Sequence, residues 1–178
     1  VKALNVAAKV LIFVVLVASF DLLLGYTGIV SFAHTMFFGI GAYGIAIAST
    51  LLGPTWGALG VGLVAALLLS LLLALAIGLF SLRVRAIFFA MITLAVASAF
   101  QTLASQLSEF TGGEDGLSFK LPEWLSPSFE LLEEPVLGVM LDGRLICYYL
   151  LFVAALVLLL ALLRIVNSAF AASARTIS

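Results

Sequence analysis

The chain has 178 residues, of which 65% are hydrophobic and 10% are charged, and its net charge at pH 7 is −1. Soluble domains carry about 25% charged residues, so this composition, with a mean hydropathy of +1.33, excludes an ordinary water-soluble domain. The near-zero charge gives no support to nucleic-acid binding. The single cysteine, Cys147, excludes an internal disulfide and a multi-cysteine metal site, and its apolar neighbours favour an inert buried thiol.

The first two predicted helices are separated by a glycine-containing break. The first covers about residues 4–24, and the second covers about residues 31–52 and is rich in glycine and aromatic side chains. Between Leu22 and Leu82 the chain has no Asp, Glu, Lys or Arg, whereas one membrane crossing needs only about 20 apolar residues. This run is too long for one crossing, and its interruption at residues 25–28 predicts a broken or re-entrant segment.

Three more hydrophobic runs follow, at about residues 56–82, 86–107 and 145–163. All five runs are hydrophobic on every face, which is the pattern of helices in lipid rather than of surface helices in a soluble protein. We therefore expect an all-α fold, a polytopic membrane helix bundle of about five spanning helices with one broken or re-entrant segment.

The distribution of charges orients the predicted bundle. Lys and Arg concentrate in short cytoplasmic loops, so the arginines within residues 83–85 and 164–175 mark the inner side. The acidic stretch 108–144 between the fourth and fifth spans is then an outer loop. The same count places the N-terminal end outside, which conflicts with Lys2 and Lys9. Either a further helix upstream or a re-entrant break would explain this conflict.

The break itself is the first candidate site. Its sequence, Gly25-Tyr26-Thr27-Gly28-Ile29-Val30-Ser31-Phe32-Ala33-His34, can unwind or kink a helix. Unwound backbone inside a membrane persists only where protein or a water-filled cavity satisfies its hydrogen bonds, and transporters use such segments to contact their substrates. The alternative is a simple inside turn between two spans. The candidate pathway residues are Gly25, Tyr26, Thr27, Gly28, Ser31 and His34.

Residues near the break also have two interpretations each. His34 is either a proton relay or ligand contact, or a neutral imidazole bonded to a neighbouring carbonyl or hydroxyl group. The absence of acidic residues within twelve positions favours the second. Asp21 lies either at the membrane edge or towards the interior of the bundle. Gly39, Gly41 and Gly44 form a small-residue face suited to close helix packing.

A glycine-rich segment opens the outer loop. Thr111-Gly112-Gly113-Glu114-Asp115-Gly116-Leu117 is either a turn whose amides point into a common space or an ordinary turn with solvated carboxylates. Its acidic spacing does not match a calcium-binding EF-hand. The rest of the loop, which contains Trp124, either lies along the membrane interface or caps a pathway. The candidate outer gate consists of Thr111, Gly112, Gly113, Asp115 and Gly116.

Several catalytic signatures are missing from the sequence. It has no nucleotide-binding phosphate loop, no H-E-x-x-H motif and no G-x-S-x-G motif, and no lysine occurs between Lys9 and Lys120. A membrane enzyme that used His34 as a base would need a nucleophile or metal partner, and Asp21 is the only carboxylate near it in sequence. We therefore expect no enzymatic activity, no cofactor and no metal site.

Three segments together resemble a known family. The run from Gly25 to Tyr43 resembles the signature G-Y-x-G-x-x-S-x-x-H-x-x-F-x-G-x-G-A-Y, which is found in permease subunits of bacterial branched-chain amino acid ABC importers of the LivM type. Residues 86–95, AIFFAMITLA, are similar to the next motif of that family, and residues 111–117 are similar to its T-G-G-x-D-G-L motif. The three motifs occur in family order and together span nearly the whole chain.

The resemblance implies that the chain is a fragment in which residues 1–178 are part of a single transmembrane permease domain, which transports without catalysing a reaction. The implied partners are a sister permease, two cytoplasmic ATPases that hydrolyse ATP and a periplasmic substrate-binding protein, and the implied location is the bacterial inner membrane. Leucine, isoleucine and valine are the default substrates, whereas close relatives carry urea and short-chain amides. A passive channel or an assembly subunit is the remaining alternative.

The end of the sequence departs from the family pattern. After the last span the family continues S-P-F-G-R and then a short helix that docks on the ATPase, whereas residues 168–175 here are SAFAASAR. The lack of the proline, the glycine and the first arginine implies a truncated or degraded coupling region over residues 164–178. The candidate coupling residues are Ser168, Phe170 and Arg175.

Overall fold

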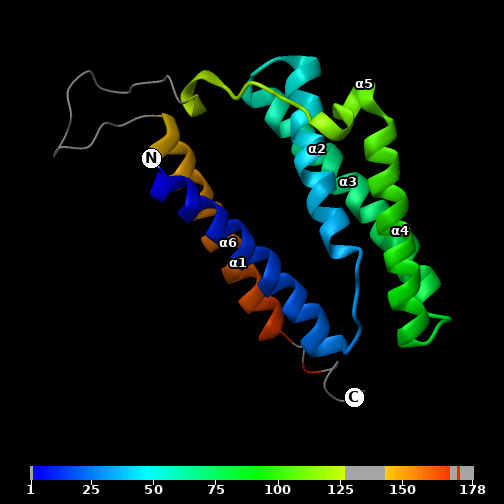
Figure 1. The fold of residues 1–178 in the computed structure, drawn as a ribbon. Coiled ribbons are helices and arrows are strands. Elements are labelled where there is room, and N and C mark those ends of the chain that lie inside the picture. The colour runs from blue at the N-terminus through cyan, green and yellow to red at the C-terminus, as the bar shows by residue number, and fades with distance from the viewer. Residues whose placement is uncertain (1, 127–142, 169–171, 173–178) are drawn as a thin grey trace. The chain divides into compact units, whose positions relative to one another are not determined.

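The structure is all-helical across the residues that it describes. The computed structural model describes residues 2–126, 143–168 and 172, and these residues form six α-helices, two 3-10 helices and no strand. Five helices are long and apolar enough to cross a membrane. They are α1 (Lys2–Thr27), α2 (His34–Leu52), α3 (Trp56–Ser81), α4 (Ala86–Gln106) and α6 (Gly143–Val166) (Figure 1). The predicted bundle of about five spanning helices is therefore confirmed.

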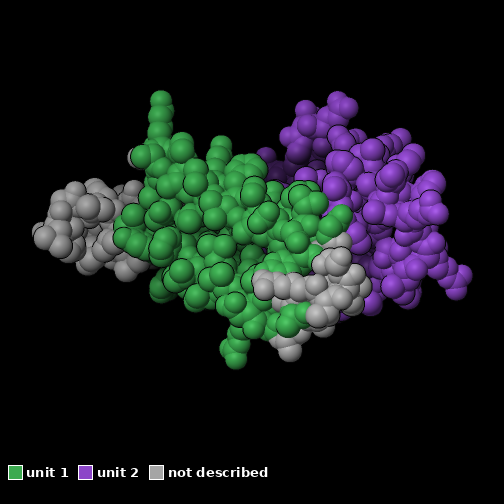
Figure 2. Space-filling model, turned by 90° about the horizontal axis from the view of Figure 1, so that it is seen from below, with its two compact units in different colours: residues 1–28, 123–178 green, residues 29–122 purple. Residues whose placement is uncertain are grey.

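The chain divides into two compact units, which Figure 2 shows in different colours. Unit 1 comprises residues 1–28 and 123–178 and contains α1, α6 and the 3-10 helix η2 (Glu123–Leu125). Unit 2 comprises residues 29–122 and contains α2, α3, α4, the short helix α5 (Ser108–Thr111) and the 3-10 helix η1 (Gly113–Asp115). The boundary between the units therefore falls within the predicted break.

In unit 1, α1 and α6 lie side by side and run in the same direction (Figure 1). The last turns of both helices line one pocket, to which Tyr26 of α1 and Val166 of α6 contribute. Arg164 lies in the last turn of α6, whereas Lys2 is the first residue of α1. The two basic residues therefore mark opposite ends of the unit, and the conflict between the N-terminal lysines and the expected orientation persists.

In unit 2, α2 packs against α3 through small residues. A Cβ atom on Gly44 would lie 2.7 Å from the Cβ of Ala66, and one on Gly62 would lie 2.7 Å from the carbonyl oxygen of Gly44 and 2.9 Å from the Cβ of Ala48. Membrane helices approach this closely only where small residues meet. The order of these contacts makes the helices antiparallel. The predicted small-residue face is confirmed at Gly44, whereas a Cβ on Gly41 would meet nothing within 4 Å.

Helix α2 also packs beside α4, and these two helices are parallel. The backbone of Phe32, just before α2, bonds Thr93 of α4, and Gly39 lies against the ring of Phe100. The two residues of each pair are 61 positions apart in the sequence (93 − 32 and 100 − 39), so the two helices run in the same direction. The buried core of the unit consists of Ala33, Met36, Ile40 and Ala66.

The chain between α2 and α3 turns for local reasons. Gly53 ends α2 with a φ of 83°, which an L-residue with a side chain rarely adopts, and Pro54 cannot continue the helical hydrogen bonding. Thr55 then starts α3, because its hydroxyl accepts a hydrogen bond of 3.1 Å from the amide of Ala58. Residues 53–55 thus form a tight connection between two complete helices.

The predicted position of the first break needs a correction. Helix α1 continues to Thr27, so Gly25 and Tyr26 are helical, and the break covers residues 28–33 instead of starting at Gly25. A glycine inside a helix costs only about 1 kcal/mol, whereas unwinding it in lipid would leave backbone groups without partners. The break begins at Gly28, whose φ of 65° is left-handed, and α2 begins at His34 rather than near residue 31.

The close contact between α2 and α3 can be tested with two substitutions in the same helix. Gly62→Leu places a side chain against the backbone of α2 and is expected to destabilise the protein by roughly 1–3 kcal/mol or more, as overpacking does. Gly60→Leu is the control, because a Cβ there meets nothing within 4 Å. Thermal unfolding in detergent should show a lower Tm for Gly62→Leu only. Equal Tm values for both variants would contradict the packing.

Candidate functional site

The centre of the candidate site is a backbone hydrogen bond between the break and α4. The amide of Phe32 donates to the hydroxyl oxygen of Thr93 over 3.2 Å, and that hydroxyl donates to the carbonyl oxygen of Ala90 over 2.9 Å. Thr93 is fully buried, with 0% of its surface exposed. A threonine in this position serves as donor and acceptor at once, so it satisfies an amide that the broken helix leaves without a helical partner.

The break is recessed from the end of the helices. Thr93 lies seven residues after Ala86, the first residue of α4, which corresponds to about 10 Å along a helix axis. The backbone of Phe32 therefore lies at that depth, measured from the end of the unit that carries Arg83 and Arg85. In unit 2, Ser31 and Ala33 of the break are buried whereas Val30 and Phe32 are exposed, so protein encloses the non-helical backbone in part.

A groove of about 550 Å³ leads from this point along α2 and α4 to the glycine-rich turn. Phe32 and Thr35 line one end, and Gly113 and Glu114 line the other. Its volume is within the range of sites for small molecules, about 300–1,000 Å³. Six of its thirteen lining residues are polar or charged, namely Thr35, Tyr43, Ser98, Gln101, Ser105 and Glu114. The groove therefore offers hydrogen bonding along its length.

Helix α4 has a polar face towards the groove. Ser98, Gln101 and Ser105 follow one another at intervals of three and four residues, which places them on one side of a helix. A second cavity of unit 2, about 480 Å³ between α2, α3 and α4, has seventeen lining residues, of which only Tyr43 and Thr111 carry polar side chains. Polar side chains inside a membrane face protein or water, so the polar groove is the candidate for a polar solute.

The glycine-rich turn is anchored to the end of α4 by Thr111. Its buried hydroxyl lies within hydrogen-bond distance of the carbonyl oxygens of Ala104 and Leu107, and it accepts the amide of Gly113 over 3.3 Å. Carbonyl groups in the last turn of a helix have no helical partner, so this hydroxyl completes the end of α4. Gly112 is left-handed, with a φ of 75°, and a Cβ on it would overlap the backbone carbonyl of Gly116.

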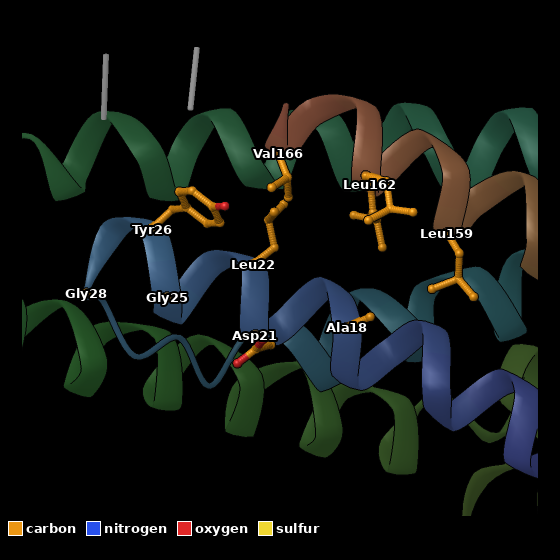
Figure 3. Close-up of a pocket in the computed structure, with 10 residues that line it drawn as sticks. Ala18, Asp21, Leu22, Gly25, Tyr26, Gly28, Leu159, Leu162 and Val166 are labelled. Atoms are coloured by element: carbon orange, nitrogen blue, oxygen red, sulfur yellow. The ribbon is translucent and has the colours of Figure 1, made fainter. Parts of the chain in front are cut away.

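Unit 1 contains a separate pocket of about 690 Å³ between the last turns of α1 and α6 (Figure 3). Asp21, Gly25, Tyr26 and Gly28 line it from α1 and its end, and leucine and valine side chains line it from α6. Asp21 is exposed in this unit. The pocket therefore joins one carboxylate and one phenol to a largely apolar wall.

The structure distributes the predicted pathway residues over both units. Gly25, Tyr26 and Gly28 line the pocket of unit 1, whereas Ser31, buried, and His34, half-buried at the start of α2, belong to unit 2. The described geometry therefore does not assemble them into a single site. Thr27 is the last residue of α1, and its side chain lies outside the described part of the chain.

Comparison with known proteins identifies the family. The family of permease components of branched-chain amino acid transport systems matches residues 2–171. No curated protein and no solved structure gives a significant match. The chain belongs to this permease family. It is therefore a multi-pass membrane protein and a membrane-embedded component of a transport system, of a family that is generally not enzymatic.

Several residues of the permease groove were not among the predicted site residues. Ser98, Gln101 and Ser105 follow the family-like segment 86–95 in the same span. The spacing of these three residues on one helix face is the signal that could have identified them. Glu114 lies inside the predicted outer gate segment, beside the gate residues Gly113 and Asp115 of η1.

The described part of the permease gives no support to a metal centre, because its residues contain no group of three or more His, Cys, Asp or Glu side chains that could hold an ion. The coupling residues are described only in part. Ser168 follows α6, and its hydroxyl donates to the carbonyl oxygen of Ile165 over 2.6 Å. Phe170 and Arg175 lie outside the described residues, so their role stays a prediction.

The Phe32–Thr93 bond predicts a specific effect of one substitution. Thr93→Val keeps the shape of the side chain and removes the acceptor, which should cost about 1–3 kcal/mol for an unsatisfied buried amide. Thr50→Val is the control, because the exposed Thr50 hydroxyl donates only within its own helix, to Ile47. Hydrogen exchange at residues 28–36 should become faster in Thr93→Val alone. Unchanged exchange would show that the bond does not hold the break.

Proposed function

We propose that the chain is the transmembrane permease subunit of an ABC importer of the LivM type, which moves branched-chain amino acids across the bacterial inner membrane. The observation that carries this proposal is the polar groove in a chain of this permease family. The groove runs from the non-helical backbone at Phe32 to the glycine-rich turn. A groove of this kind gives a small amphipathic solute hydrogen-bond partners at membrane depth.

The proposed mechanism is alternating access driven by ATP on partner chains. Ser31 and His34 contribute to the pathway from unit 2, and Gly25, Tyr26, Thr27 and Gly28 contribute from the end of α1. The segment Thr111–Gly116 serves as the outer gate. The left-handed φ of 65° at Gly28 supports a pathway role for the end of α1, because the chain leaves the helix at this residue.

The proposed partners follow from this mechanism. They are a sister permease, two cytoplasmic ATPases and a periplasmic substrate-binding protein, and the whole of residues 1–178 belongs to one permease domain. The segment after α6, with Ser168, Phe170 and Arg175, is the proposed contact with an ATPase. The end of unit 2 with Arg83 and Arg85 faces the cytoplasm, in agreement with the positive-inside rule.

Urea and short-chain amides are the second candidate substrates. None of the described residues that line the groove is basic, so the groove supplies no positive side chain to a carboxylate. The hydroxyl groups and the Gln101 amide can bond a neutral amide equally well. The choice between the two substrate classes therefore depends on whether the groove favours charged or neutral solutes.

Uptake by the complete importer tests the proposed function. Gly28→Ala strains a left-handed backbone by about 1–2 kcal/mol, and it is expected to slow leucine uptake several-fold. Gly60→Ala is the control, because Gly60 is helical, lies outside the proposed pathway, and a Cβ there meets nothing within 4 Å. Normal uptake with both Gly28→Leu and His34→Ala would refute the pathway. If the chain copurifies with no ATPase, the importer assignment fails, and a channel or assembly role takes its place.

The orientation can be measured by labelling single cysteines in a Cys147→Ala background in intact cells. A cysteine that replaces the exposed Glu109 should react with a membrane-impermeant thiol reagent from outside. A cysteine that replaces Arg83 should react only after the cells are opened. The reverse pattern would invert the proposed direction of the groove.

A further inference from the structure

The groove has a single charged group, and this group stands at one end. Of the described residues that line it, only Glu114 is charged, and it lies in η1 beside Gly113. Towards the break, the wall continues with the polar face of α4 and ends at Thr35 and Phe32. The groove is therefore electronegative at its mouth and neutral along its interior.

The turn fixes the backbone that carries Glu114 relative to α4. Thr111 ties the turn to the carbonyl oxygens at the end of α4 and accepts the amide of Gly113, which directly precedes Glu114. Gly112 turns against the backbone of Gly116, where no side chain could fit. A charge held near low-dielectric walls acts on a solute more strongly than a charge on a freely moving loop.

We infer that the α2–α4 groove is a water-filled vestibule that selects solutes by their charge. Glu114 favours the entry of solutes whose ammonium group enters first, and it disfavours anionic solutes. This inference rests on the proposed function and narrows it. Among amino acids, the class already named by the proposed function, this selection favours those with a single carboxylate. A second carboxylate would meet Glu114 with no basic residue among the described lining residues, whereas a neutral amide could gain a hydrogen bond from Glu114 but no attraction between opposite charges.

The apolar part of the wall supports the same class of solute. Met36, Leu94 and Phe100 line the groove opposite or between the polar residues of α4. An aliphatic side chain can pack against these residues while the ammonium group bonds the hydroxyl and amide oxygens of Ser98, Gln101 or Ser105. The groove thus combines a polar track with an apolar wall, as an amphipathic amino acid requires.

Thiol labelling of the assembled transporter tests this inference without a transport assay. In a Cys147→Ala background, Ser98→Cys and Ser105→Cys place thiols on the groove wall. Ala99→Cys is the control at the same depth of α4, because Ala99 does not line the groove. Each variant is treated with a cationic and an anionic methanethiosulfonate reagent of similar size. Each rate is divided by the rate of the same reagent with free cysteine.

The expected result is a charge preference that depends on Glu114. At both groove positions the cationic reagent should react about three-fold or more faster than the anionic one after normalisation, because the carboxylate attracts cations at short range. Glu114→Gln should reduce the ratio to about one, whereas Glu109→Gln should leave it unchanged, since Glu109 does not line the groove. Ala99→Cys should react slowly with both reagents.

Two outcomes would overturn the inference. No labelling at residues 98 and 105 would show that the groove is dry, and a ratio unaffected by Glu114→Gln would show that this carboxylate does not control entry. Wild-type elution of each variant complex from a sizing column controls for folding. Failure of leucine uptake with the expected labelling pattern would instead count against the proposed function alone.

Discussion

The structure of unit 2 depends on one constraint: backbone amides inside a bilayer need hydrogen-bond partners within the protein. The break between α1 and α2 would violate this constraint if the fourth helix did not place Thr93 against Phe32. The threonine hydroxyl also bonds Ala90 in its own helix, so it fits an apolar helix without further polar neighbours. The amide of Phe32 therefore keeps a partner within the protein although the helix is interrupted there.

The small residues between α2 and α3 have a second consequence for the site. Because Gly44 and Gly62 bring the two backbones together, α2 is held firmly on the α3 side. The side of α2 towards α4 contacts it more loosely, at Phe32 and at Gly39, and the polar groove lies there. Tight packing on one side of α2 thus leaves room for a solute on the other.

Sequence reasoning predicted the helices well and the site only in part. Long apolar runs set the positions of the five spans, because no soluble surface could be built from them, and the family-like motifs indicated a permease. The predicted start of the break was wrong, because Gly25 is helical. Glycine destabilises a helix in water, whereas in lipid the helix is retained because it satisfies its own backbone hydrogen bonds. The role of Thr93 could not be predicted, since it depends on the register between α2 and α4, which no local pattern specifies.

Helix α4 links the two ends of the groove mechanically. Near its start, Thr93 holds the break, and beyond its end, Thr111 holds the turn that carries Glu114. Both attachments are hydrogen bonds of single hydroxyl groups, each worth about 0.5–1.5 kcal/mol, and both can be exchanged for water without unfolding a helix. A shift of α4 along α2 by one residue, about 1.5 Å, would strain the Phe32–Thr93 bond, whereas the turn, which is tied to the end of α4, would move with the helix. The break and the glycine-rich turn are therefore coupled through a rigid helix, which is the kind of connection that the proposed alternating access requires.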